Sequence, residues 1–172
     1  MKPVCITFAG VPGSSKTPIA HHLSCVFNLP ILANDVIRTE LREDTLSNVL
    51  DQYKYLERVI QRIESLTEKR RSFIYDASND RHWYKFLQNK GMSDYEVVVI
   101  SIDLTRSFYM TLLDAKKYEV FMNKIDTYMK DHENFLENSK MRIICHINDD
   151  NFSHRLETAE ASVKTFLKGT VD

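Results

Sequence analysis

The sequence predicts an α/β fold in which helices cover both faces of a mainly parallel, five-stranded sheet. Five short apolar segments alternate with longer segments of helical periodicity, and strands that alternate with helices form parallel sheets. The apolar segments lack a polar face, which is typical of strands buried on both sides. A length of 172 residues suits one domain, residues 1–172. The expected strands are 4–8, 31–33, 72–76, 96–103 and 141–147.

The loop after the first strand has the glycine spacing of a phosphate-binding loop. It reads Gly10-Val11-Pro12-Gly13-Ser14-Ser15-Lys16-Thr17 and leads into a helical segment. Glycine lets the backbone wrap a phosphate closely, and the N–H groups of the loop and helix start attract the anion. In such a loop, Lys16 reaches the β- and γ-phosphates and Thr17 binds magnesium. We therefore predict a nucleotide site at residues 10–17.

Ser15 departs from this pattern, which has glycine before the lysine. A serine in a left-handed backbone conformation is strained. We expect the loop to form but to bind its ligand less tightly than a loop with glycine there.

Two helices are expected between the second and third strands. Asp35 follows the second strand and is expected to cap a helix that runs to about Arg42. A longer helix is expected to begin at Asp44 or Thr45 and to bury one apolar stripe. The stripe comprises Leu46, Val49, Leu50, Tyr53, Leu56, Ile60 and Ile63. Later helices are expected at 81–90, within 105–140 and at 153–168.

The composition limits the functional classes. Hydrophobic residues make up 43% and charged residues 27%, as in soluble globular proteins, and the net charge of −1 attracts neither nucleic acid nor membrane. A nucleic-acid partner would need a local basic patch, and the basic residues within 58–71 alternate with glutamates, which favours an ion-paired face. Three scattered cysteines predict a reduced, cytoplasmic protein. No stretch is long enough to span a bilayer.

The order of these motifs resembles the P-loop kinases, in particular the small AAA-type ATPases and kinases related to polynucleotide 5′-hydroxyl kinases, zeta toxins and chloramphenicol phosphotransferase. The resemblance rests on the loop, on Asn34-Asp35-Val36-Ile37-Arg38 after strand two, and on Ile74-Tyr75-Asp76-Ala77-Ser78-Asn79 at strand three. It implies the strand order 2-3-1-4-5, and ATP and Mg²⁺ as cofactors. It also implies transfer of the γ-phosphate to a hydroxyl of a small molecule, a sugar nucleotide or a polynucleotide end.

The resemblance also implies roles for three further side chains. Asp35 would orient the acceptor hydroxyl and accept its proton, while Arg38 would bind a phosphate or carboxylate of the acceptor. Asp76 would hold magnesium through water at the end of strand three. The alternatives are a helix-capping role for Asp35, a surface position for Arg38 and a turn-forming role for Asp76.

A lid-like helical segment is expected at about 104–140. Related kinases usually carry two or more arginines there, which neutralise the transferred phosphoryl group. Arg106 is the only arginine between Thr105 and Lys140, so we expect it to be catalytic, with Arg81 as an alternative. Lys116 and Lys117 are expected on a solvated helix face. Three functions stay open: a kinase, an ATPase or nucleotide-dependent switch, and a nucleotide-binding protein without activity.

Overall fold

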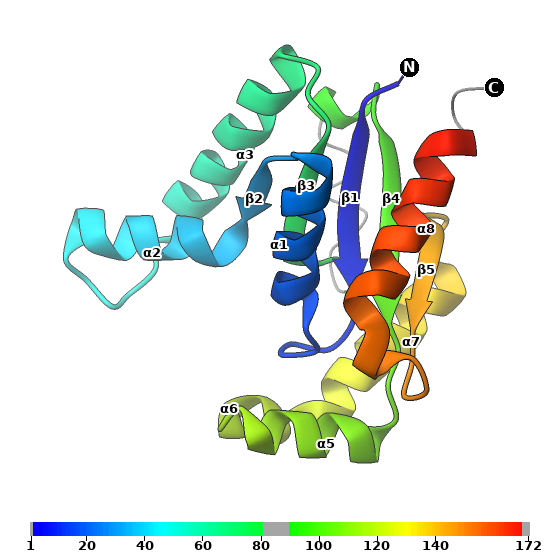
Figure 1. The fold of residues 1–172 in the computed structure, drawn as a ribbon. Helices are drawn as coiled ribbons and strands as arrows, with labels where there is room; N and C mark the ends of the chain where they lie inside the picture. Colours follow the sequence, from blue (N-terminus) through cyan, green and yellow to red (C-terminus); the bar gives the residue numbers. More distant parts are fainter. Residues whose placement is uncertain (1, 81–89, 170–172) are drawn as a thin grey trace.

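The five strands form one parallel sheet in the order β2-β3-β1-β4-β5 (Figure 1). A computed structural model describes residues 2–80 and 90–169, so Arg81 and nearly all of the helix expected at 81–90 lie outside the described residues. The strand order and the parallel directions confirm the predicted fold class. The strands are β1 (Val4–Ala9), β2 (Ile31–Ala33), β3 (Phe73–Ser78), β4 (Glu96–Ile102) and β5 (Arg142–Ile147).

Helices cover both faces of the sheet, which explains why its central strands β1 and β4 are mainly apolar. Alternate residues of β1 enter different clusters: Ile6 and Phe8 belong to the cluster formed with α1 (Lys16–Phe27) and α8 (Arg155–Gly169). Cys5 packs on the opposite face with α2 (Asn34–Thr45) and α3 (Gln52–Glu68). Both faces of β1 are therefore dry, as in other parallel sheets.

The prediction for the second of the helices between β2 and β3 was wrong in its start and in most of its buried stripe, although Leu50 and Ile63 pack on the core as expected. The helix α3 begins at Gln52, because the Asp51 carboxylate accepts hydrogen bonds from the N–H groups of Tyr53 and Lys54. Leu46 and Val49 belong to the connection before it and are exposed. The buried stripe contains Tyr55, Val59 and Ile63, whereas Tyr53, Leu56 and Ile60 face solvent. Apolar residues cover two adjacent stripes of α3, and only packing against α2 and the sheet selects between them.

The segment expected to form a lid is helical, as predicted, and contains three helices. They are α5 (Arg106–Ala115), α6 (Glu119–Met122) and α7 (Ile125–Asn138). The Thr105 side chain caps α5 by accepting a hydrogen bond from Phe108 N, and Lys117, at φ 59°, lies in the turn that ends it. Figure 1 shows α5 and α6 below the loop end of the sheet, with α7 leading back to β5.

Two further expectations concern the cysteines and membrane-spanning helices. All three cysteines are free; Cys5 and Cys145 are buried, but Cys25 is exposed on α1. Within residues 2–80 and 90–169, no helix is both long enough and apolar enough to cross a membrane.

Candidate active site

The loop between β1 and α1 requires glycine at two positions. Gly10 has φ 141°, and a Cβ atom there would lie 2.8 Å from the carbonyl oxygen of Ile102. Gly13 has φ 84°, and its Cβ would lie 2.6 Å from Leu113 Cδ2 of α5. Ser15 has φ 85°, the left-handed conformation in which a side chain is strained. The loop thus forms with a serine held where glycine is favoured.

Lys16 is folded against the loop that precedes it. Its Nζ donates to the carbonyl oxygens of Gly10 and Val11, both at 2.7 Å, and to Ser14 Oγ at 3.2 Å. Burial lowers the pKa of Lys16 to about 8, although the carboxylates of Asp80 and Asp76 favour the charged form. The ammonium group therefore lies at the centre of the loop, where an anion would bind.

Thr17 and Asp76 meet at the carboxyl edge of the sheet. Thr17 Oγ1 donates to Asp76 Oδ2 at 2.8 Å, across 59 residues of sequence. Burial raises the pKa of Asp76, while the hydrogen bond from Thr17 and the charge of Lys16 act in the opposite direction. A hydroxyl and one carboxylate are the hard oxygen donors that Mg²⁺ uses together with substrate phosphates. The donor set fits magnesium, and no cluster of three or more metal-binding side chains occurs among the described residues.

Asp35 and Arg38 lie at the start of α2 and form an ion pair. The predicted capping role of Asp35 is wrong, because Ala33 is the N-cap and Asp35 lies inside the first turn with its side chain 90% exposed. The Arg38 guanidinium also stacks 5.1 Å from the centroid of the Tyr55 ring. Ala33 pairs with Asp76 in the sheet register, so Asp35 follows β2 at the same edge of the sheet as the Thr17–Asp76 pair.

A buried pair that the sequence did not predict, Asp80 with His132, supports the phosphate-binding loop through the backbone of Gly10. The Asp80 carboxylate accepts from the Gly10 N–H at 3.0 and 3.1 Å and lies 3.3 Å from His132 Nδ1 of α7. Burial opposes its charge, but the hydrogen bond with His132 and the charges of His132 and Lys16 lower the pKa of Asp80. In the sequence, Asp80 ends a run of polar residues that is typical of a turn. The available signal was His132, a polar residue at helical spacing between Tyr128 and Phe135 on an apolar stripe.

Replacing Asp80 with asparagine should destabilise the protein by about 3 kcal/mol, the usual scale for breaking a buried charged pair. The amide cannot offer two acceptor oxygens to Gly10 N–H and His132. Urea denaturation would measure the loss. Asp94→Asn is the matched control, because Asp94 is exposed and its ion pair with Arg70 is long, at 3.9 Å. Equal midpoints for the two variants would show that the buried pair does not stabilise the fold.

Of Arg106, Lys116 and Lys117 in the lid-like segment, only Lys116 lies differently from the prediction. The Arg106 guanidinium pairs with Asp126 and has no described contact with the loop, so its catalytic role stays a prediction. Lys117 is exposed as expected. The solvated position predicted for Lys116 is wrong, because its Nζ donates to the Gly13 carbonyl at 2.6 Å. Arg155 also reaches the loop, because its Nε donates to Ser15 Oγ. The signal in the sequence was the position of this arginine in the first turn of a helix, where the helix dipole disfavours a positive charge.

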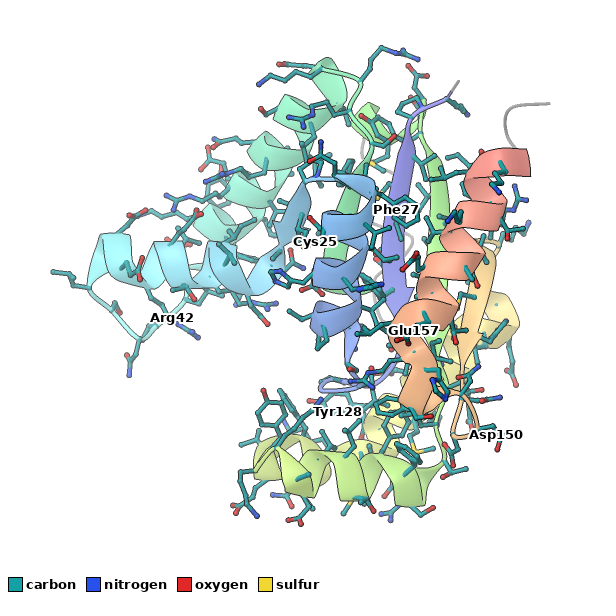
Figure 2. The ribbon with its side chains drawn as sticks, in the orientation of Figure 1. Cys25, Phe27, Arg42, Tyr128, Asp150 and Glu157 are labelled. Carbon is teal, nitrogen blue, oxygen red and sulfur yellow. The ribbon has the colours of Figure 1, made fainter. Side chains whose placement is uncertain are left out.

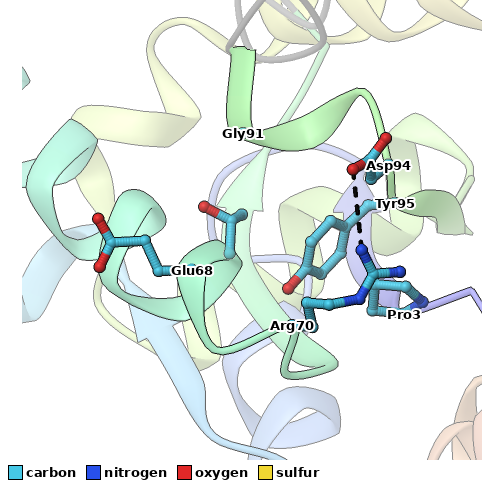
Figure 3. Close-up of a pocket in the computed structure, with 7 residues that line it drawn as sticks. Pro3, Glu68, Arg70, Gly91, Asp94 and Tyr95 are labelled. Atoms are coloured by element: carbon cyan, nitrogen blue, oxygen red, sulfur yellow. Dashed lines mark ion pairs between the residues drawn. The ribbon is translucent and has the colours of Figure 1, made fainter.

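A separate cavity of about 240 Å³ lies at the opposite end of the sheet (Figure 3). Pro3, Thr67 and Tyr95 line it, and Arg70 and Asp94 form an ion pair at its rim. Its described lining contains none of the predicted site residues. The chemistry-bearing side chains gather at the loop instead.

Comparisons with known proteins identify the fold. No protein-family model matches the sequence, and no curated protein does so either. Among solved structures, a gluconokinase from Sinorhizobium meliloti 1021 matches with a TM-score of 0.67 at 13% identity, over 99% of this chain and 97% of that chain. A sugar kinase from Janibacter sp. HTCC2649 matches with a TM-score of 0.66 at 14% identity, over 94% and 95%. A shikimate kinase from Aquifex aeolicus vf5 matches with a TM-score of 0.58 at 14% identity, over 98% and 99%.

These similar structures are P-loop kinases, which confirms the resemblance noted in the sequence. At such low identities the similarity concerns the fold and leaves the substrate open. The chain has the fold of the P-loop kinases.

Proposed function

We propose that the protein is an ATP-dependent phosphotransferase that moves the γ-phosphate of ATP to a hydroxyl acceptor. One observation carries the proposal: the Lys16 loop, the Thr17–Asp76 pair and Asp35 meet at one edge of the sheet. This edge is where ligands bind in open parallel sheets. The three free cysteines support a place in a reducing compartment, the cytoplasm.

Each part of the site has a task in this proposal. Loop N–H groups and Lys16 hold the phosphates, while Thr17 and Asp76 hold Mg²⁺, Asp76 through water. Magnesium, when bound, supplies positive charge next to the phosphate oxygens. Asp35 orients the acceptor hydroxyl and accepts its proton, and Arg38 holds the Asp35 carboxylate in place.

The acceptor side favours a small, uncharged hydroxyl compound. A shallow hollow of about 300 Å³ runs along α2 and is lined by Asp35, Val36, Thr39, Glu40 and Glu43. The charged side chains of this lining are all carboxylates, of which Asp35 and Glu40 are already paired with arginines, so the hollow offers a polyanion no cation. We therefore favour an alcohol or polyol over a polynucleotide end.

An acceptor screen with labelled ATP tests the proposal. The protein would be incubated with ATP, Mg²⁺ and separate panels of polyols, nucleosides, sugar nucleotides and polynucleotide 5′-ends. We expect label on one class of hydroxyl compound. Hydrolysis of ATP without labelling of any acceptor would favour the ATPase or nucleotide-dependent switch, and a protein that neither hydrolyses nor transfers would be a nucleotide-binding protein only.

Replacing Asp76 with asparagine should raise the Mg²⁺ concentration needed for half-maximal turnover about tenfold or more. The amide keeps the shape and can still accept from Thr17 Oγ1, but it removes the negative charge that attracts the cation. A magnesium titration at saturating ATP would measure the shift. Asp103→Asn, at an exposed carboxylate on the same edge of the sheet, is the control. Identical magnesium curves for Asp76→Asn and wild type would remove Asp76 from the metal site.

A further inference from the structure

Two cations from distant parts of the chain reach the phosphate-binding loop. Lys116, at the end of α5, donates to the Gly13 carbonyl at 2.6 Å. Arg155, at the start of α8, donates from Nε to Ser15 Oγ at 2.8 Å. In Figure 2 the first turn of α8, next to the labelled Glu157, lies beside the loop, and α5 lies below it. Lys116 and Arg155 therefore reach the loop from two different elements, the end of α5 and the start of α8.

Among residues 2–80 and 90–169, neither cation has an acidic partner. Other arginines differ: Arg58, Arg106 and Arg142 each form an ion pair with a carboxylate. Within the described part of the chain, the hydrogen bonds of Lys116 and Arg155 all go to neutral oxygens.

The cations at the loop also affect one another. Burial lowers the pKa of Lys116, and the charge of Arg155 lowers it further. The charge of Lys116 in turn acts to lower the pKa of Lys16. Lys116 and Arg155 are half-buried positive charges without a carboxylate partner among the described residues, so a bound polyphosphate would stabilise them.

Both side chains keep hydrogen-bond donors for such a ligand. An ammonium group has three donors and a guanidinium five. The described contacts use one donor of Lys116 and two of Arg155, whose Nη1 donates to the Phe152 carbonyl at 3.1 Å. The Arg155 guanidinium also lies 4.6 Å from the centroid of the Phe152 ring, which restrains it next to the turn that precedes α8.

We propose that Lys116 and Arg155 bind the phosphate oxygens of the nucleotide from two sides of the loop and take the role predicted for the lid arginines. The inference rests on the proposed nucleotide-dependent function. It also explains Ser15, because a glycine at this position would relieve the strained backbone but would remove the oxygen that positions Arg155. The serine is therefore part of the site rather than a defect in it.

Binding of ATP and of inorganic tripolyphosphate, measured by calorimetry, tests the proposal. Tripolyphosphate has no base or sugar, so it reports on the phosphate contacts alone. Lys116→Gln and Arg155→Gln should each weaken both ligands about tenfold, the scale of one hydrogen bond to a charged group. Lys117→Gln is the matched control, because this neighbouring lysine is 82% exposed. The affinity of this variant for both ligands should stay within about twofold of wild type.

Charge-retaining variants separate a binding role from a folding defect. Lys116→Arg and Arg155→Lys should recover most of the affinity, whereas a variant that is merely misfolded would not recover it. Wild-type affinity in both glutamine variants would overturn the proposal while leaving the proposed function intact. A larger loss in Arg106→Gln than in either variant would also overturn it, since the lid role would then belong to Arg106. A wild-type protein that binds neither ligand would overturn both the inference and the proposed function.

Discussion

Replacing Lys16 with alanine should abolish nearly all of the thermal stabilisation that ATP gives to the wild-type protein. A ligand that binds only the folded state stabilises it by about 2.7 kcal/mol at 100 times its Kd. Lys16 carries the buried ammonium at the centre of the loop, and its removal should weaken ATP about 100-fold. The same ATP concentration would then stabilise the variant by only about 0.4 kcal/mol.

Thermal unfolding with and without ATP measures this difference. Lys54→Ala is the control, since Lys54 is exposed on α3 and should leave the ATP-induced shift unchanged. An undiminished shift in Lys16→Ala would contradict the assignment of the loop as the nucleotide site.

The lowered pKa of Lys16 adds a pH dependence to the same expectation. Burial lowers this pKa to about 8, with Asp80, Asp76 and Asp35 opposing the shift and Lys116 adding to it. Phosphate oxygens attract the protonated form, so ATP affinity without magnesium should fall as the pH rises above about 8, and binding there should take up protons. A constant ATP affinity from about pH 7 to about pH 9.5 would contradict a role for the Lys16 charge in ATP binding.

Replacing Asp35 with asparagine should lower phosphoryl transfer about 100-fold or more while leaving ATP affinity nearly unchanged. The amide keeps the size of the side chain but cannot accept the hydroxyl proton, and loss of general-base catalysis usually has this scale. The helix should tolerate the change, because Ala33 rather than Asp35 occupies the N-cap position.

The structure offers a closely matched control in Asp44→Asn. Asp44 lies on the same helix and also pairs with an arginine, since Arg58 Nη1 lies 2.7 Å from Asp44 Oδ2. It lies at the far end of α2 from Asp35, so transfer in this variant should match wild type. Equal transfer rates in Asp35→Asn and wild type would show that Asp35 is not the base, and the acceptor screen would then decide between kinase and ATPase.

The sequence alone determined the sheet and the phosphate-binding loop, because both depend on local patterns. Strands buried on both faces are mainly apolar along their whole length, so β1 and β4 are recognisable without their neighbours. Gly10 and Gly13 adopt positive φ values that glycine favours, so their spacing in the chain carries the shape of the loop. The motif order was enough to predict the strand order through the family resemblance.

The tertiary structure decided which side chains support and surround that loop. Asp80 meets His132, and Arg155 meets Ser15, across 52 and 140 residues of sequence, so no local pattern links these partners. The same reason explains the error in α3, where two apolar stripes satisfy helical periodicity equally and packing buries only one of them. Periodicity and spacing describe what one segment can form, whereas burial and charge depend on the segments that fold against it.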